Sequence, residues 1–369
     1  MYVQVSYKKQ IIVFLILFVL LLFAVEIGAR VIEYSGENQC EFIGKDAFKN
    51  VEIIKQNQIC EDNSSIMYEV DGILKFIPNQ NMETININSH GFRGHDFSEK
   101  KDLDTYRIFI VGGSTIFGSG ATSDDTTIPS FLQKKFEATH SDQKIEILNA
   151  GIESGYSYSE KYLIENYLIK FQPDLIIIYS GGNDANNRYG VEYTVPGLPI
   201  SQLTPYVEQT DFVGSVKKFI KEINYRSPFV LMKIYKGMEQ NFTPSESTTN
   251  QVQELWTTRM GEICKANNDV GIKTIILVQP MLGSGNKQLS TDEKILLENY
   301  GAYMEDTLDI LNEIAGSLVE LENICHGTYD LRMIFDDVKE PLLFDHMHVT
   351  DLGNEIVAEE IYEILINQL

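Results

Sequence analysis

Residues 107–114 read Arg-Ile-Phe-Ile-Val-Gly-Gly-Ser, and this stretch decides the fold class of the chain. Its branched and aromatic side chains show no polar alternation, which predicts a short strand, Arg107–Val111, buried on both faces. Gly112 and Gly113 then permit a tight turn. Ser114 is therefore expected at the carboxyl end of a buried strand, exposed above the edge of a sheet.

Apolar runs and helical patterns alternate on the C-terminal side of this stretch. We expect further strands at Ile145–Leu148, Leu175–Tyr179 and Thr274–Val278, and helices at Thr127–Ala138, Ser157–Phe171, Thr248–Ala266 and Leu352–Leu369. Buried strands that alternate with helices predict βαβ units and a parallel sheet. Ligand sites in such sheets lie at the carboxyl ends of the strands, where the Gly, Ser and Asn residues of this chain collect.

The chain is predicted to have three parts. Residues 1–30 are expected to be a cytoplasmic stub and membrane anchor, and residues 31–105 an extension that leads into the domain. Residues 106–369 are expected to form the α/β domain. Within it, residues 186–247 lack the strand–helix rhythm and are interpreted as an insertion, a cap on the substrate side.

The N-terminal part carries a targeting signal. Lys8 and Lys9 precede an uninterrupted apolar run, Ile11–Val25, which fits a short transmembrane helix or the core of a signal peptide. The small-residue cleavage pattern is poor, which favours an uncleaved single-pass anchor. A buried core helix is disfavoured because no polar face interrupts the run. Positive charge before the run places residues 1–9 in the cytoplasm and the catalytic domain on the extracytoplasmic side; cleavage would make the protein secreted.

Composition and cysteine content exclude several classes of protein. The 369 residues include 30 Lys and Arg against 53 Asp and Glu, and the net charge of −23 argues against a nucleic-acid partner. A hydrophobic fraction of 43% is that of a globular protein. The four cysteines form no zinc pattern. Outside the cytoplasm they can pair, and of three connectivities we expect Cys40–Cys60 and Cys264–Cys325.

Ser114 is a candidate nucleophile because it lies in a tight turn at a strand end. Two phosphate-binding motifs are incomplete here. Gly113 and Gly118 have the spacing of a Walker loop, but Ser119 and Gly120 stand where Lys and Ser or Thr are required; Gly118-Ser119-Gly120 lacks the third glycine of a dinucleotide fingerprint. No Gly-x-Ser-x-Gly elbow surrounds Ser114, which excludes an ordinary α/β-hydrolase. A purely structural turn is the alternative.

Asp345-His346-Met347-His348 precedes the last predicted helix. An aspartate three residues before a histidine can contact its ring, fix the tautomer and stabilise the imidazolium, which is the orienting role in a catalytic triad. The alternatives are a helix cap for Asp345 and a metal pair of His346 and His348. Metal is disfavoured because no other His or Cys cluster is evident.

Gly151 and Asn183 follow two other predicted strands. A glycine N–H and an asparagine amide are the kinds of donor that form an oxyanion hole. Each is by itself also a common turn residue. The four sites occur in order, each at or near a predicted strand end, and this arrangement favours a catalytic site.

These four blocks resemble those of the SGNH hydrolases, also called the GDSL family. The matching residues are Gly112-Gly113-Ser114, with Gly113 where aspartate is commoner; Gly151; Gly181-Gly182-Asn183-Asp184; and Asp345 with His348. The upstream segment Asn88–Gly94 resembles one found before the domain in membrane-anchored members. The resemblance covers about residues 86–369 by the placement of the motifs.

The resemblance implies a fold, a mechanism and a set of roles. The fold would be a flavodoxin-like three-layer α/β/α sandwich with a five-stranded parallel sheet. Ser114 would be the nucleophile, His348 the general base and then acid, and Asp345 the residue that orients His348. The oxyanion hole would consist of the Ser114 and Gly151 N–H groups and the Asn183 side chain. No metal and no organic cofactor is implied.

The expected activity is that of a serine esterase with a small-molecule or glycan ester as substrate, such as an O-acetyl group on an extracytoplasmic glycan, or a lipid ester. One alternative is an O-acyltransferase of cell-surface polysaccharide, in which the acyl-enzyme passes its acyl group to a sugar hydroxyl in place of water. The other is a non-catalytic glycan-binding protein on the same scaffold. The sequence predicts no oligomeric state.

Overall fold

The computed structural model describes residues 6–36, 40, 42–71, 73–140, 142–187 and 246–368. The chain divides into two compact units, Met1–Cys40 with Pro199–Thr243, and Glu41–Leu198 with Pro244–Leu369, and each is described by itself. Nearly all of the predicted insertion, residues 188–245, lies outside the described residues. The extension from Glu41 onward belongs to the same unit as the sheet.

The described part of the first unit is a helix, α1 (Tyr7–Gly36). Its apolar side chains from Ile11 to Leu21 are exposed. However, none of the helices described is long and apolar enough to cross a membrane. The predicted transmembrane anchor in residues 1–30 is therefore not supported, since the uninterrupted run Ile11–Val25 is shorter than the roughly 20 residues that a spanning helix needs.

The centre of the second unit is a five-stranded sheet in the order β6-β5-β7-β8-β9, with every neighbouring pair parallel. The strands are β5 (Thr105–Gly112), β6 (Lys144–Gly151), β7 (Leu175–Ser180), β8 (Lys273–Val278) and β9 (Gly327–Asp330). Every residue of β7 is buried, as expected for a central parallel strand covered on both faces. The α/β class and the five-stranded parallel sheet are thus confirmed.

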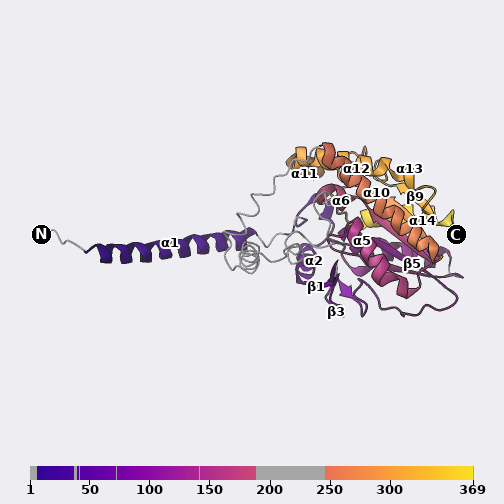
Figure 1. The fold of residues 1–369 in the computed structure, drawn as a ribbon, viewed down its shortest axis with the longest axis horizontal. Helices are drawn as coiled ribbons and strands as arrows, with labels where there is room; N and C mark the ends of the chain where they lie inside the picture. The colour runs from indigo at the N-terminus through magenta and orange to yellow at the C-terminus, as the bar shows by residue number, and fades with distance from the viewer. Residues whose placement is uncertain are drawn as a thin grey trace, which may run out of the picture. The chain divides into compact units, whose positions relative to one another are not determined.

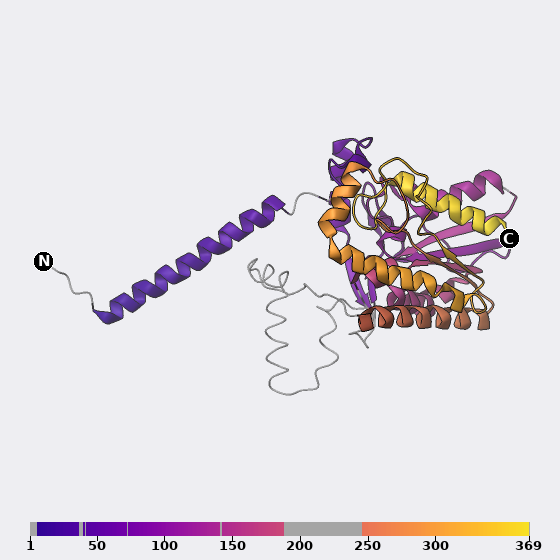
Figure 2. The same cartoon turned by 90° about the horizontal axis from the view of Figure 1, so that it is seen from above.

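Helices cover both faces of the sheet (Figures 1 and 2). One layer contains α4 (Ile128–Thr139) and α14 (Asp351–Ile366), which pack on each other. The opposite layer contains α5 (Ser157–Leu163), α10 (Glu246–Asp269) and α12 (Ala302–Gly316), and α10 contacts both of its neighbours. The result is the three-layer sandwich.

The remaining elements are short or lie at the edges. Those of the extension are η1 (Asp46–Phe48), α2 (Ile53–Ser65), β1 (Tyr68–Asp71), β2 (Ile73–Phe76), β3 (Gln80–Asn81) and β4 (Asn86–Ile87), with β1–β2 and β3–β4 forming antiparallel pairs. Those of the domain are α3 (Ser114–Phe117), η2 (Asp124–Thr126), η3 (Ile164–Leu168), η4 (Ile169–Phe171), α6 (Gly182–Asn187), α11 (Thr291–Tyr300) and α13 (Leu318–Leu321).

The register of the sheet aligns the strand ends that carry the predicted site. Gly112 of β5 pairs with Gly151 of β6 on one side and with Tyr179 of β7 on the other. The Gly112-Gly113 turn, the loop after Gly151 and the Gly181-Gly182 turn therefore leave the sheet at the same edge.

A disulfide joins Cys264 of α10 to Cys325, two residues before β9. This confirms the predicted Cys264–Cys325 pairing. Cys40 and Cys60 are also disulfide-bonded.

Candidate active site

Ser114 is the first residue of α3 and follows the end of β5 directly. The turn that presents it depends on glycines. A Cβ on Gly112 would lie 2.6 Å from the Tyr179 carbonyl oxygen, and one on Gly113 would lie 2.5 Å from Asn183 Nδ2. The aspartate that is commoner in the family at position 113 therefore has no room here, which accounts for the departure at this position.

The predicted triad residues lie in a continuous hydrogen-bonded sequence. The Ser114 Oγ atom is 2.6 Å from His348 Nε2, and His348 Nδ1 is 2.6 Å from Asp345 Oδ2. The other carboxylate oxygen, Asp345 Oδ1, accepts hydrogen bonds from the backbone N–H groups of Met347 (2.8 Å) and His348 (2.7 Å). The loop that follows Asp345 thus wraps around its carboxylate and fixes the side chain that faces the histidine.

Asp345 is held in its charged form. Burial alone raises the pKa of this carboxyl group, but the charge of His348 and its side-chain and backbone hydrogen bonds, together with the charge of His346, outweigh burial and lower the pKa to about 2. An ionised Asp345 accepts a proton-bearing Nδ1, so His348 Nε2 is left as the acceptor of the Ser114 hydroxyl. The arrangement can remove a proton from Ser114.

His346 does not share the environment of His348. Its Nδ1 atom lies 4.0 Å from Asp345 Oδ1, and its ring stands edge-on to Tyr300. Burial lowers the pKa of His346, which favours the neutral ring. The metal-pair alternative is not supported, because both ring nitrogens of His348 already contact protein partners, Ser114 and Asp345. In the described ranges no group of three His, Cys, Asp or Glu side chains is placed to hold a metal ion.

The structure places Asn183 beside Ser114. Asn183 lies in α6, just beyond the end of β7, and its Nδ2 atom approaches the backbone of Gly113. One Nδ2 hydrogen is donated to the Gly155 carbonyl oxygen at 2.6 Å. The second amide hydrogen has no acceptor among the described residues, so Asn183 can still donate to a substrate oxygen.

Gly151, the other predicted oxyanion donor, has a different role in this structure. Its N–H donates to the side-chain oxygen of Asn149 at 3.0 Å. Its Cα packs against α3, where an added Cβ would lie 2.0 Å from the Phe117 nitrogen. Gly151 therefore provides space for α3, and its N–H is already engaged.

Gly155 is the residue that the sequence analysis did not single out. Its carbonyl accepts from Asn183, and a Cβ on Gly155 would lie 3.3 Å from the Gly113 Cα. It is the second glycine of the loop that follows β6, four positions after Gly151. A glycine in the first loop beyond a strand end was the available signal, and its distance from the strand concealed it.

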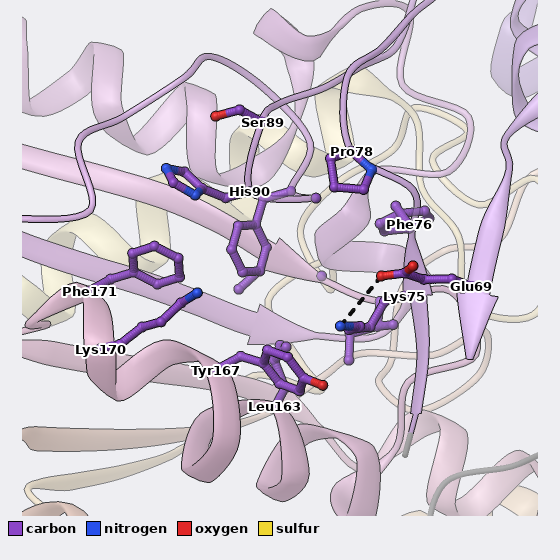
Figure 3. A pocket seen from close by; sticks show the side chains of 15 residues that line it. Glu69, Lys75, Phe76, Pro78, Ser89, His90, Leu163, Tyr167, Lys170 and Phe171 are labelled. Atoms are coloured by element: carbon purple, nitrogen blue, oxygen red, sulfur yellow. Dashed lines mark ion pairs between the residues drawn. The ribbon is translucent and has the colours of Figure 1, made fainter. Parts of the chain in front are cut away.

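A cavity of about 210 Å³ lies behind the end of β6 (Figure 3). The extension and the η3–η4 segment form its walls, with Lys75 paired to Glu69 at 3.5 Å and lying 4.0 Å from the centre of the Tyr167 ring. Ala150, Gly151 and Ile152 contribute to its lining, but Ser114, Asp345 and His348 do not. The cavity is therefore separate from the site of the predicted triad.

The fold and this site define an α/β protein in which a serine, a histidine and an aspartate follow one another in hydrogen-bond contact at the end of a parallel sheet. Residues 108–361 match the family model of the GDSL-like Lipase/Acylhydrolase. The match spans more than half of the chain, so the protein belongs to this family and is a hydrolase that acts on ester bonds.

Solved structures with a similar fold include an α/β hydrolase enzyme from the metagenome of Lake Arreo, Spain (12% identity, 70% of this chain and 94% of that chain, TM-score 0.40). Another is a putative lipolytic protein of the G-D-S-L family from Desulfitobacterium hafniense (13% identity, 70% and 98%, TM-score 0.39). A third is an acetyl xylan esterase (14% identity, 70% and 99%, TM-score 0.42). No curated protein matches the chain.

Proposed function

We propose that the protein is a serine esterase in which Ser114 forms the acyl-enzyme. The observation that carries this proposal is the unbroken series of contacts from Ser114 Oγ through His348 to the ionised Asp345, with 2.6 Å at each step. This is the arrangement of nucleophile, base and orienting group that activates a hydroxyl. The family membership supplies the reaction class, ester hydrolysis.

In the proposed cycle, His348 Nε2 takes the Ser114 proton while Oγ attacks the ester carbonyl carbon. The C–O bond to the alcohol breaks, and the imidazolium gives its proton to the leaving alkoxide. Water then attacks the acyl-enzyme with His348 again as base, and the Ser114 oxygen leaves with the returned proton. The products are one carboxylic acid and one alcohol per water consumed.

The proposed oxyanion site consists of the Ser114 N–H and the second hydrogen of Asn183 Nδ2. Ser114 supports this role because it begins α3, where a backbone N–H has no partner within the helix. Asn183 supports it through its position against Gly113. Gly151 is left out of the proposed site, since its N–H is bonded to Asn149.

We place the substrate outside the cytoplasm, as an O-acetyl group of a glycan or as a lipid ester. The Cys264–Cys325 bond and the oxidised state of Cys40 and Cys60 support a compartment in which disulfides persist. The surplus of acidic side chains supports a neutral ester over an anionic one.

The test is hydrolysis of p-nitrophenyl acetate, butyrate and octanoate by the full chain, with the Ser114→Ala variant beside it. We expect Ser114→Ala to lose at least about 1000-fold in kcat, because removing the nucleophile leaves only binding and oxyanion contacts. An unchanged melting temperature is the control for folding. Ser114-independent turnover would refute the mechanism. Faster acyl transfer to an added oligosaccharide than to water would assign the chain to acyl transfer instead.

A further inference from the structure

The segment Asn88–Gly94 belongs to the extension, and the proposed chemistry leaves its sequence unexplained. The structure forms it into a tight turn. The Asn88 side-chain oxygen accepts the backbone N–H groups of His90 and Phe92, each at 3.0 Å, and Gly91 has a φ of +82°. Such a turn fixes the direction of the residue that follows it, Arg93.

The Arg93 side chain is buried and fully engaged, with a residue exposure of 3%. Its Nη1 atom donates to the carbonyl oxygens of Phe117 (3.2 Å) and Gly118 (2.7 Å). Its Nη2 atom donates to the Thr84 carbonyl at 2.9 Å, and its Nε atom donates to Asp124 Oδ1 at 2.8 Å. Two of the four acceptors therefore lie at the C-terminal end of α3.

The helix α3 is a single turn of four residues, and Ser114 is its first residue. A helix this short has little stability of its own, because nucleation is unfavourable and few backbone bonds repay it. The carbonyl groups of its last turn also need partners from outside the helix. Asn149 Nδ2 contacts the Ile116 carbonyl at 2.9 Å, and Arg93 supplies the rest of the contacts. A cation at this end also suits the helix dipole.

We propose that Arg93 is a positioning residue for the esterase reaction, holding α3 from its C-terminal end so that Ser114 Oγ stays within reach of His348 Nε2. The inference rests on the proposed nucleophilic role of Ser114. Arg93 touches neither Ser114 nor His348, and it acts through the backbone of α3. The extension is accordingly part of the working enzyme, and the Asn88–Gly94 turn delivers its essential side chain.

Arg107 provides a matched control. It is also buried, with 2% exposure, and donates to one carboxylate, Glu146, and to the carbonyl oxygens of Phe171 and Ser98. Like Arg93, it therefore braces the extension against the domain. However, Arg107 lies near the start of β5, at the opposite end of that strand from Ser114, and makes no contact with α3.

The experiment compares Arg93→Lys and Arg107→Lys in the full chain. Three quantities are measured: the second-order rate of Ser114 labelling by a fluorophosphonate probe, kcat and KM for p-nitrophenyl acetate, and the melting temperature. In labelling, the Ser114 oxygen forms a bond to phosphorus and fluoride leaves, so the rate reports the placement of the hydroxyl without the ester substrate. Both variants should melt earlier, because each loses buried hydrogen bonds.

We expect Arg93→Lys to reduce kcat and the labelling rate by about 10- to 100-fold with KM within about twofold, since small misplacements of reacting groups have effects of this size. Arg107→Lys should keep both rates within about threefold. Equal losses in the two variants, or wild-type labelling of Arg93→Lys, would overturn the proposal. Absence of Ser114 labelling in the wild-type protein would instead remove the proposed function.

A second variant covers the case in which Arg93→Lys does not fold. Asp124→Asn keeps an oxygen acceptor for Arg93 Nε but removes the charge that holds the guanidinium. We expect a smaller loss of labelling rate, about three- to tenfold, with KM unchanged. An unchanged labelling rate in a folded Asp124→Asn variant would also count against the positioning role.

Discussion

Asp345 is the residue whose surroundings contribute most to the electrostatics of the site. It is 7% exposed, yet its charge is matched on both oxygens, with the His348 ring on one and two backbone N–H groups on the other. Because its pKa is lowered to about 2, the carboxylate stays ionised across the whole range in which a histidine titrates. Any acid limb of the activity profile above about pH 4 therefore belongs to a group other than Asp345.

We predict that Asp345→Asn lowers kcat by about 1000- to 10,000-fold with little change in KM. An amide preserves the shape but cannot stabilise the imidazolium, and it allows the wrong tautomer of His348. Steady-state hydrolysis of p-nitrophenyl acetate measures the effect, and Asp351→Asn, in the next helix, is the control for loss of one negative charge. A loss of less than about tenfold would show that His348 works without its carboxylate.

The sequence predicts part of this site well at the residue scale. Ser114, Asp345 and His348 can be recognised because each lies in a short motif at a strand end or before a helix, and parallel strands bring those ends to one edge. Gly151 could not be judged in the same way. Whether its N–H is available depends on the Asn149 side chain, and a hydrogen bond between two near neighbours leaves no mark in the sequence pattern.

At the scale of elements, α5 and α6 are tied together beneath Asn183 by two buried carboxyl groups. Asp184 of α6 accepts from the hydroxyl (2.5 Å) and the backbone N–H (3.0 Å) of Ser157, at the start of α5. Glu160 of α5 accepts from the Ser180 hydroxyl at 2.7 Å, at the end of β7. Arg259 of α10 donates to the Ser157 hydroxyl at 2.9 Å and is the nearby cation.

The two carboxyl groups make stability depend on pH. Burial and then the neighbouring Asp184 raise the pKa of Glu160 well above its usual range, and burial raises the pKa of Asp184 to about 6. Between the unfolded and the folded pKa values the native state binds more protons than the unfolded state. These groups therefore favour folding most below about pH 4, and this contribution is lost as pH rises through 6.

We predict that Glu160→Gln stabilises the protein at pH 8 relative to pH 5. The glutamine oxygen still accepts from Ser180, while the variant no longer carries a buried charge beside Asp184. Urea unfolding at the two pH values measures the change, and we expect a gain of about 1 to 3 kcal/mol at pH 8 that shrinks at pH 5, at about 1.4 kcal/mol for each pKa unit removed. An equal effect at both pH values would contradict the assignment.

Element boundaries show where sequence patterns lose information. The predicted helix Ser157–Phe171 is three successive segments, α5, η3 and η4, because a π turn at Ile164–Leu168 widens the helix while its apolar spacing stays nearly helical. β9 carried no strand signal of its own. Gly327–Asp330 is an edge strand whose residues are all half-buried, so it needs no apolar run.

For the molecule as a whole, the order of the strands could be inferred only through the resemblance. The alternation of strands and helices predicts a parallel sheet, but it does not say that β5 lies between β6 and β7. That order depends on long-range packing in the core, in which Trp256 of α10 is completely buried. The N-terminal run shows the opposite error, since apolar composition alone suggested a spanning helix that its length does not support.

The Cys264–Cys325 disulfide acts on the molecule as a whole and lies away from the site. The two cysteines are 61 residues apart, and closing a loop of that length restricts the unfolded chain considerably. Cys325 precedes β9, and the N–H of His326 bonds to Thr274 at the start of β8. The bond is therefore at the amino edge of the sheet, whereas Ser114 is at the carboxyl edge, so its loss should change stability but not catalysis.

We predict that replacing both cysteines, Cys264→Ala with Cys325→Ala, lowers the free energy of unfolding by about 2 to 4 kcal/mol, the range expected for a loop of this length and for the loss of a native bond. Urea unfolding of the oxidised wild type and the double variant measures it. Below the melting temperature, kcat for p-nitrophenyl acetate should stay within about twofold, because the strand ends that carry Ser114 and Asn183 are fixed by the sheet register and not by this bond. A stable protein with reduced kcat would mean that the two edges of the sheet are coupled, and that α10 transmits strain to the helix carrying Asn183, which it contacts directly.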